Sequence, residues 1–170
     1  PELKVAGKTL PKTDCDQMFT MDANGGDVNL ISGAKGRTTC GFYFHDNSHV
    51  LYSSTAATSE ACPAAPDKSK GYAWPVYPQY HLYSAKPDGS DTQPMEAKPP
   101  FAYTAEATVC ADGAVVFTSD RDGDLELYTA KIGPDRKLVG IRRLTWTVGY
   151  DGGAVFSQDC KQIGWRASRP

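Results

Sequence analysis

The chain has 170 residues, including 16 glycines and 12 prolines, and a formal net charge of −2. This length is enough for one domain with a hydrophobic core, and a near-neutral chain without a basic stripe argues against a nucleic acid partner. No apolar run approaches the length of a membrane span, so we expect no transmembrane segment in this chain. No signal peptide is visible, and the chain starts at Pro1, so we expect a removed leader or a piece of a longer protein.

The N-terminal part predicts an extended lead-in over residues 1–14, followed by half a repeat unit over 15–34. Residues 17–22 alternate like a strand, Ala23-Asn24-Gly25-Gly26 is a hairpin turn signal, and 28–31 forms the next strand. These two strands match the third and fourth strands of a unit later in the chain.

A whole unit is predicted over residues 37–98. Its first two strands flank a turn at His45-Asp46-Asn47-Ser48, its third strand is 80–85, and a weak fourth strand lies near 95–97. An insertion over 56–78 separates the second and third strands. Its prolines and aromatic residues predict an ordered surface loop that packs on its own side chains.

The last third contains a second whole unit over 102–146 and the first half of another over 150–170. Asp112 and Asp159 hold the same place in these two copies, 47 residues apart, and Asn47 aligns with Asp112. A period of this size with four short strands per copy is typical of a β-propeller blade.

We therefore expect an all-β fold of four-stranded antiparallel propeller blades, because no segment carries a helical apolar stripe of useful length. The strands add up to about three blades' worth. This is too few to close a propeller, which needs about four to eight blades.

The sequence resembles the TolB-like family of β-propellers, built from WD-type or PD-type repeats, from about Cys15 onward. The motifs that carry the resemblance are FTMDANGG, RTTCGFYF, YAWPVYP, AEATVCADG, FTSDRDGDLELYTA, RRLTWTVGYDGGAVFSQD and WRASRP. The resemblance implies blades around a channel, usually six of them, a periplasmic or otherwise extracytoplasmic location, and a role in protein–protein contact. The family's Ser-Pro-Asp-Gly turn appears here only in altered form, as in Cys110-Ala111-Asp112-Gly113.

The incomplete blade count predicts a partner that supplies strands, since exposed blade edges invite aggregation. The chain is then a segment of a longer propeller, or another protein completes it. Alternatively, the N-terminal half unit of one copy completes the C-terminal half unit of another copy, so that two chains build a six-bladed ring.

Five cysteines are scattered without the CxxC spacing of a zinc ribbon, which is compatible with disulfides in an exported protein. Cys110 and Cys160 are candidates for one bridge, because both sit beside the first turn of adjacent units. Cys40 is a candidate for pairing with Cys62 or Cys15. The odd count leaves at least one thiol unpaired within the chain.

Three further patterns suggest chemistry but have simpler explanations. Asp120, Asp122 and Asp124 resemble the start of a calcium loop, but residue 131, where an EF-hand needs Glu, is Lys, and Asp and Gly are ordinary turn residues. The three histidines (His45, His49 and His81) lack metal-ligand spacing. No Gly-x-Ser-x-Gly elbow is present, so we expect no catalytic site and no cofactor, with calcium as a weak alternative.

Polar residues at the start of the first strands are the candidates for a small ligand, since those strands line the channel of a propeller. These channel-mouth candidates are Arg37, Thr38, Thr104, Glu106 and Asp151. The aromatic residues of the insertion and the strand after it are the candidates for a protein interface, because Tyr and Trp dominate interface hot spots. They are Tyr72, Trp74, Tyr77 and Tyr80.

The function expected from these features is that of a non-catalytic extracytoplasmic module for protein–protein interaction or scaffolding. One form of it is an accessory subunit of a membrane-associated complex. The alternative is a propeller segment of a peptidase or amidohydrolase, which gates access of the substrate.

Overall fold

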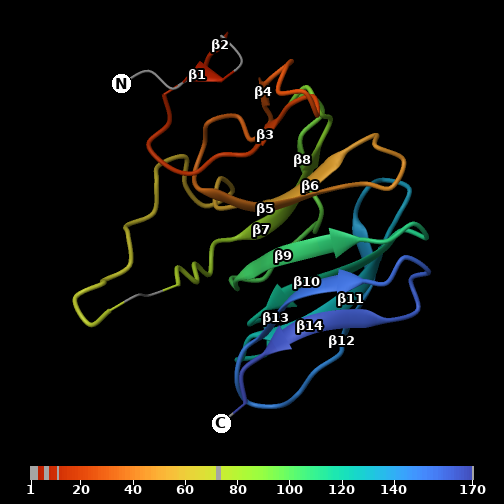
Figure 1. The fold of residues 1–170 in the computed structure, drawn as a ribbon. Helices are drawn as coiled ribbons and strands as arrows, with labels where there is room; N and C mark the ends of the chain where they lie inside the picture. Colours follow the sequence, from red (N-terminus) through yellow and green to blue (C-terminus); the bar gives the residue numbers. More distant parts are fainter. Residues whose placement is uncertain (1–3, 6–7, 11, 72–73, 170) are drawn as a thin grey trace.

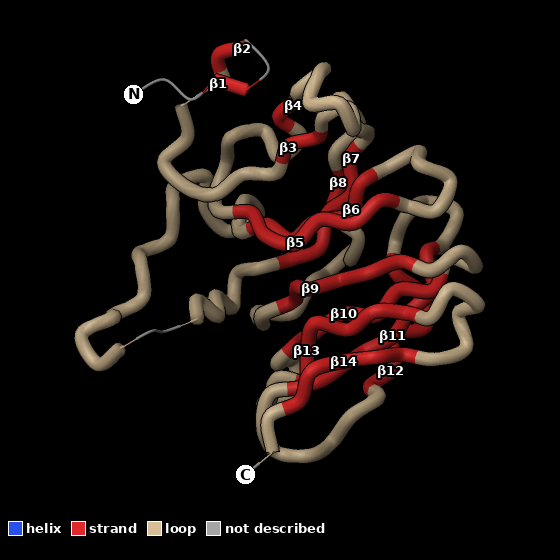
Figure 2. The backbone as a smooth tube through the Cα atoms, in the orientation of Figure 1, coloured by secondary structure: helices blue, strands red, loops and turns tan. Residues whose placement is uncertain are grey.

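The computed structural model describes residues 4–5, 8–10, 12–71 and 74–169. Within these residues the fold contains strands and loops and no helix (Figure 2). Two antiparallel sheets have four strands each, and three smaller sheets are two-stranded hairpins. The all-β prediction and the prediction of four-stranded blades are therefore confirmed.

The first four-stranded sheet has its strands in chain order: β5 (Thr38–Tyr43), β6 (Val50–Ser54), β7 (His81–Ala85) and β8 (Gln93–Pro94). The fourth strand lies slightly before the expected position, because Met95 turns into the core and is fully buried. The second sheet contains β9 (Thr104–Val109), β10 (Ala114–Ser119), β11 (Glu126–Ile132) and β12 (Leu138–Arg143).

Three hairpins complete the fold. They are β1–β2 (Lys4–Val5 and Lys8–Thr9), β3–β4 (Phe19–Thr20 and Asn29–Leu30) and β13–β14 (Asp151–Phe156 and Ile163–Ala167). The segment expected to be an extended lead-in thus includes the small hairpin β1–β2. Strands β3 and β4 are shorter than the sequence pattern predicts.

Separate hydrophobic cores join each sheet to the next one along the chain. Leu51 and Leu82 of one four-stranded sheet pack with Phe117 and Tyr128 of the other. Ile31, next to the β3–β4 hairpin, packs on the first of these sheets, and a further core joins the second sheet to Ala154 and its neighbours in the β13–β14 hairpin. Buried apolar faces between successive sheets are the packing expected of neighbouring blades.

Strand β5 contacts β9, and β9 contacts β13, so that the first strands of these three sheets lie in sequence across the molecule (Figure 1). In a propeller the innermost strands have this arrangement around the channel. We therefore describe β5, β9 and β13 as the inner strands.

The two ends of the sheets differ in their connections. One end has tight turns in which an aspartate accepts a hydrogen bond from the backbone N–H two residues later, at Asp46, Asp88, Asp112, Asp135 and Asp159. The other end has the insertion, the loops that join one sheet to the next and the C-terminal residues (Figure 1). We call these the turn end and the loop end.

The repeat alignment requires one correction. Asn47, Gly113 and Cys160 all have positive φ (59°, 77° and 60°) and occupy the same turn position. Asp112 is therefore equivalent to Asp46 rather than to Asn47, and the predicted alignment of Asn47 with Asp112 is wrong by one residue. Asn is among the non-glycine residues that adopt the left-handed conformation most often, so Asn47 can take the place that Gly113 has in the later turn.

Candidate functional site

Each inner strand contains a residue with positive φ at the same place: Cys40 (48°), Glu106 (56°) and Gly153 (60°). The register between first and second strands shifts at each of these sites, which marks a β-bulge. Glu106 and Gly153 are 47 residues apart, the repeat period. The left-handed conformation costs about 1–3 kcal/mol for a residue with a side chain, so Cys40 and Glu106 store strain at this wall.

The three bulges line a cleft of about 350 Å³ on the wall formed by the inner strands. Its other walls include Phe42 of β5, Trp74 of the insertion and Val155 of β13. Tyr150, just before β13, and Arg166 of β14 complete the lining. We call it the inner-strand cleft. Of the channel-mouth candidates, Glu106 lines this cleft.

A single carboxylate oxygen organises the inner-strand cleft. Oε2 of Glu106 accepts hydrogen bonds from the hydroxyls of Thr118 (2.9 Å) and Tyr150 (2.7 Å) and from the backbone N–H of Gly153 (2.8 Å). Burial of Tyr150 and its hydrogen bond to Glu106 raise the pKa of the phenol to about 12. The guanidinium of Arg166 lies over the Tyr150 ring, 5.1 Å from the ring centroid.

Three of the other channel-mouth candidates are the first residues of the inner strands. Thr38, Thr104 and Asp151 begin β5, β9 and β13, and the side chains of all three are buried. All three therefore hold the first position of an inner strand. Their burial shows that they join neighbouring sheets and do not form an open rim.

The junction between the two four-stranded sheets is built on Arg121. Its guanidinium donates to both carboxylate oxygens of the buried Glu96 (3.1 and 3.3 Å) and to the hydroxyls of Thr104 and Ser119. The rings of Phe117 and Tyr128 flank the same guanidinium. A carboxylate buried to this extent requires such pairing.

The junction between the second sheet and the β13–β14 hairpin contains two buried carboxylates. Asp151 accepts from Arg169 (2.7 Å) and from the indole N–H of Trp165 (2.8 Å), and Glu126 accepts from Arg143 (2.7 Å). Sequence reasoning did not find Glu126, although it is the first residue of β11, the position that His81 holds in β7.

The aromatic candidates divide into different environments. Trp74 is exposed on the insertion, whereas Tyr77 packs on Tyr80 and donates its hydroxyl hydrogen bond to the carbonyl of Ala64. Tyr80 is only 3% exposed and packs against Tyr103, so the prediction that it is an anchor exposed to a protein partner is wrong. Tyr72 lies outside the described residues.

The most exposed large apolar side chains are on loops that sequence reasoning did not select: Phe101 (73% exposed), Trp146 (69%) and Val148 (76%). Both loops are at the loop end. Backbone anchors hold them in place, since Tyr103 N–H donates to Asp120 (2.7 Å) and Gly149 N–H donates to Asp124 (2.9 Å). The exposed rings are thus presented on fixed loops.

The aspartates of the expected calcium loop have roles within the protein. Asp120 and Asp124 accept the backbone hydrogen bonds that anchor these loops, and Asp122 accepts from the hydroxyl of Tyr128 (2.7 Å). Among the described residues, the one group of three metal-binding side chains with ligand atoms within 4.8 Å is Cys110, Asp112 and Cys160. Two of these are joined in a disulfide, so no metal site is proposed.

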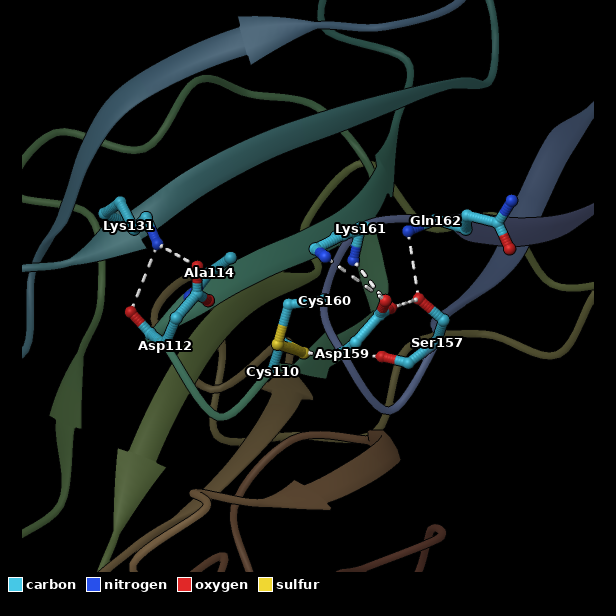
Figure 3. Close-up of a disulfide and its surroundings, with 9 residues drawn as sticks. All are labelled: Cys110, Asp112, Ala114, Lys131, Ser157, Asp159, Cys160, Lys161 and Gln162. Carbon is cyan, nitrogen blue, oxygen red and sulfur yellow. Dashed lines mark hydrogen bonds and ion pairs between the residues drawn. A yellow bond between two sulfur atoms is a disulfide. The ribbon is translucent and has the colours of Figure 1, made fainter.

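Two disulfides are present. Cys110–Cys160 joins the end of β9 to the turn between β13 and β14, as predicted (Figure 3). Cys15–Cys62 joins the N-terminal segment to the insertion, and Cys40 is a free thiol. The prediction that Cys40 takes part in a bridge is therefore wrong, because its place on the inner strand β5 directs it to the inner-strand cleft.

Four-stranded sheets stacked through apolar cores, with neighbouring inner strands, define a partial β-propeller. Comparison with solved structures agrees. The chain is similar to a putative TolB from Agrobacterium tumefaciens (13% identity, TM-score 0.64), TolB from Acinetobacter baumannii (18%, 0.58) and a structure in a nidogen–laminin complex (13%, 0.61). The three alignments include 96%, 88% and 89% of this chain, in the same order. They include only 47%, 31% and 48% of the solved chains.

The fold is thus a TolB-like β-propeller fold, of which this chain spans about half or less. Comparisons of the sequence with models of known families and with curated proteins found no match. No helix among the described residues is long and apolar enough to cross a membrane.

Proposed function

We propose that the chain is a non-catalytic module for protein–protein interaction that works outside the cytoplasm, as an accessory subunit of a membrane-associated complex. The observation that carries this proposal is that the three most exposed large apolar side chains, Phe101, Trp146 and Val148, lie at the loop end. Trp74 is also on a connection at the loop end. Exposed rings on fixed loops lose little conformational entropy on binding, which favours their use in an interface.

The turn end is the internal contrast. Among the described residues, its five aspartate turns contain no exposed large hydrophobic side chain. Charged groups dominate it instead, with ion pairs such as Lys131–Asp112 and Arg136–Asp91. Met21 (56% exposed) and Tyr43 (42%) lie beside this end, but they are less exposed than Phe101, Trp146 and Val148. The loop end is therefore the better candidate for a protein interface.

Completion of the ring belongs to the same proposal. The β13–β14 hairpin has two strands, whereas each complete sheet has four, and the chain spans 47% of the TolB structure from Agrobacterium tumefaciens. We propose that strands from the rest of a longer propeller, or from another chain, pair with β14. Trp165 on this strand is half exposed and would be covered by them.

The extracytoplasmic location is supported by the two disulfides, which persist in oxidising compartments and are rare in the cytosol. The test is a thiol count on denatured protein isolated without reductant. One reactive thiol, that of Cys40, is expected. Five thiols would contradict the proposed location.

The test of the interaction itself is affinity capture from the native host with matched variants. Trp146→Ala with Phe101→Ala should lose the captured protein, whereas Lys161→Ala at the turn end should retain it. Retention by the loop-end variant would refute the proposed interface. A hydrolase motif elsewhere in the open reading frame would instead favour the alternative, in which the propeller gates a peptidase or amidohydrolase.

A further inference from the structure

A second cleft, of about 400 Å³, lies between the insertion and the start of β5. Pro66, Lys68 and Trp74 of the insertion form one wall, and Arg37 and Tyr80 form the other, with Asp16 at its edge. We call it the insertion cleft. Its size is within the range of small-ligand and peptide-side-chain pockets.

The start of the insertion is tied to the elements beside the insertion cleft. The Cys15–Cys62 disulfide ties the N-terminal segment to the insertion. The backbone N–H of Thr38 donates to the carbonyl of Asp16, and that of Gly36 donates to the carbonyl of Glu60, both at 2.9 Å. A cleft with covalently and hydrogen-bonded walls loses little entropy when it is filled.

Arg37 is a charged residue of this cleft with a hydrogen-bond donor that lacks an acceptor. Its side chain is 21% exposed, and its Nε is buried without a hydrogen-bond acceptor. The nearest carboxylate oxygen, Oδ2 of Asp16, is 3.6 Å away on a side chain that is 77% exposed. The ring of Tyr77 covers the guanidinium at 5.9 Å. A buried charged donor without an acceptor is costly, and a planar guanidinium suits a carboxylate best.

We propose that the insertion cleft binds an acidic peptide segment of the partner protein. The Asp or Glu carboxylate of this segment accepts hydrogen bonds from Arg37, and a neighbouring apolar side chain packs against Trp74 and Pro66. Asp16 acts as an internal, loosely held substitute for this carboxylate. The inference rests on the proposed interaction function and names the chemistry of the partner.

The charges of the cleft agree with this assignment. Arg37 supplies a positive charge that is only 21% exposed, whereas Asp16, the carboxylate paired with it at 3.6 Å, is 77% exposed. A peptide carboxylate therefore supplies a closer negative partner for this guanidinium. A basic segment would repel this guanidinium, and a neutral segment would offer it a hydrogen-bond acceptor without the opposite charge.

The experiment is calorimetric titration of the oxidised chain with a panel of capped pentapeptides. Each has a central Glu flanked by Leu, Phe, Val or Pro, and each has a twin with Gln in place of Glu. At least one Glu peptide should bind about tenfold or more tightly than its twin, and added salt should weaken it. If no Glu peptide binds better than its twin, the proposal is overturned.

Four variants assign the binding to the cleft. Arg37→Gln should weaken binding about 10- to 100-fold, and Arg37→Lys should weaken it less, since Lys keeps the charge but not the fork geometry. Asp16→Asn should strengthen binding about two- to fivefold, because it removes the internal competitor. Lys35→Gln removes a neighbouring charge that pairs with Glu60 outside the cleft and should change little.

Circular dichroism and the melting temperature verify that each variant is folded. Equal binding by wild type and Arg37→Gln, or by Lys35→Gln and Arg37→Gln, would overturn the assignment to Arg37. The outcome is separable from that of the proposed function. Capture of a partner that needs Trp146 but is indifferent to Arg37→Gln would leave the loop-end interface standing and refute the insertion cleft.

Discussion

Asp151 on β13 and Glu126 on β11 bring two buried carboxylates to one junction between two sheets, where the backbone N–H of Asp151 donates to the carbonyl of Leu125 (2.8 Å). Oδ2 of Asp151 and Oε2 of Glu126 are both buried without a hydrogen-bond donor. Arg169 donates a hydrogen bond to Oδ1 of Asp151, and Arg143 donates one to Oε1 of Glu126. Each of the two buried carboxylates at this junction therefore has one arginine as its charged partner.

Asp151 should make the stability of this junction sensitive to acid. Burial alone would raise its pKa, but hydrogen bonds from Arg169 and Trp165 outweigh burial and hold the pKa below 3.8. Because the pKa of Asp151 is lower in the folded than in the unfolded chain, its ionised carboxylate adds to the free energy of unfolding above about pH 4. This contribution is lost as the pH falls through the pKa of the folded state. Asp151→Asn should cost about 1–3 kcal/mol at pH 7. Urea unfolding should show this difference shrinking below pH 3.8; a constant difference would contradict the argument.

Arg121 should be essential to the other junction. Arg121→Met leaves the carboxylate of Glu96 buried without its partner, and the cost should be about 3–5 kcal/mol. The double variant Arg121→Met with Glu96→Gln should recover a large part of that loss, because the stranded charge is gone. A double-mutant cycle by urea unfolding measures the coupling. Additive losses would show that the two side chains act independently.

The repeat period and the recurring aspartate turns predicted most of the fold, because they divide the chain into short strands at regular spacing. Cys110–Cys160 was predictable for the same reason, since both residues flank equivalent turns. The pairing of Cys15 with Cys62 was not, because it depends on how the insertion folds back on the N-terminal segment. Cys40 was misassigned for that reason.

The candidate site was predicted less well than the fold. A sequence shows that Thr38, Thr104 and Asp151 are equivalent, but not that the next sheet covers them. The exposed ring of Trp146 and the buried ring of Tyr80 look alike in sequence, because exposure is decided by loop anchors and neighbouring sheets. The positive φ of Glu106 carries no local signal, since Glu has no preference for that conformation.

The Cys110–Cys160 disulfide should stabilise the propeller as a whole. It closes a loop between residues 50 positions apart and links two neighbouring sheets. Replacing both cysteines by Ala should lower the free energy of unfolding by about 2–4 kcal/mol. Cys15→Ala with Cys62→Ala should instead loosen the insertion and affect the sheets less. Hydrogen exchange of the two double variants shows whether protection is lost throughout the sheets or only in the insertion. A larger loss of protection in the sheets for the Cys15 and Cys62 variant than for the Cys110 and Cys160 variant would contradict this prediction.

Gly152 should not tolerate a side chain. A Cβ at this position would lie 2.4 Å from Oε2 of Glu106 and, as a closer clash, against the hydroxyl of Tyr150 at 2.3 Å. Gly152→Ala should therefore break the hydrogen bond between Tyr150 and Glu106 and cost about 1–3 kcal/mol. Gly164→Ala on β14 is the matched control, because the nearest atom would be 4.0 Å away. Similar melting temperatures for the two variants would refute the close approach.

The phenol of Tyr150 should report the charge of Glu106. Burial first, and then the hydrogen bond that Tyr150 donates to Glu106, raise its pKa to about 12. Glu106→Gln keeps an oxygen acceptor but removes the negative charge, which opposes formation of the phenolate. The pKa of Tyr150 should then fall toward 10.0. Carbon-13 NMR of ring-labelled protein, with Tyr150→Phe to assign the resonance, measures this value. An unchanged titration in Glu106→Gln would show that burial alone sets the pKa and that the Glu106 charge does not govern the inner-strand cleft.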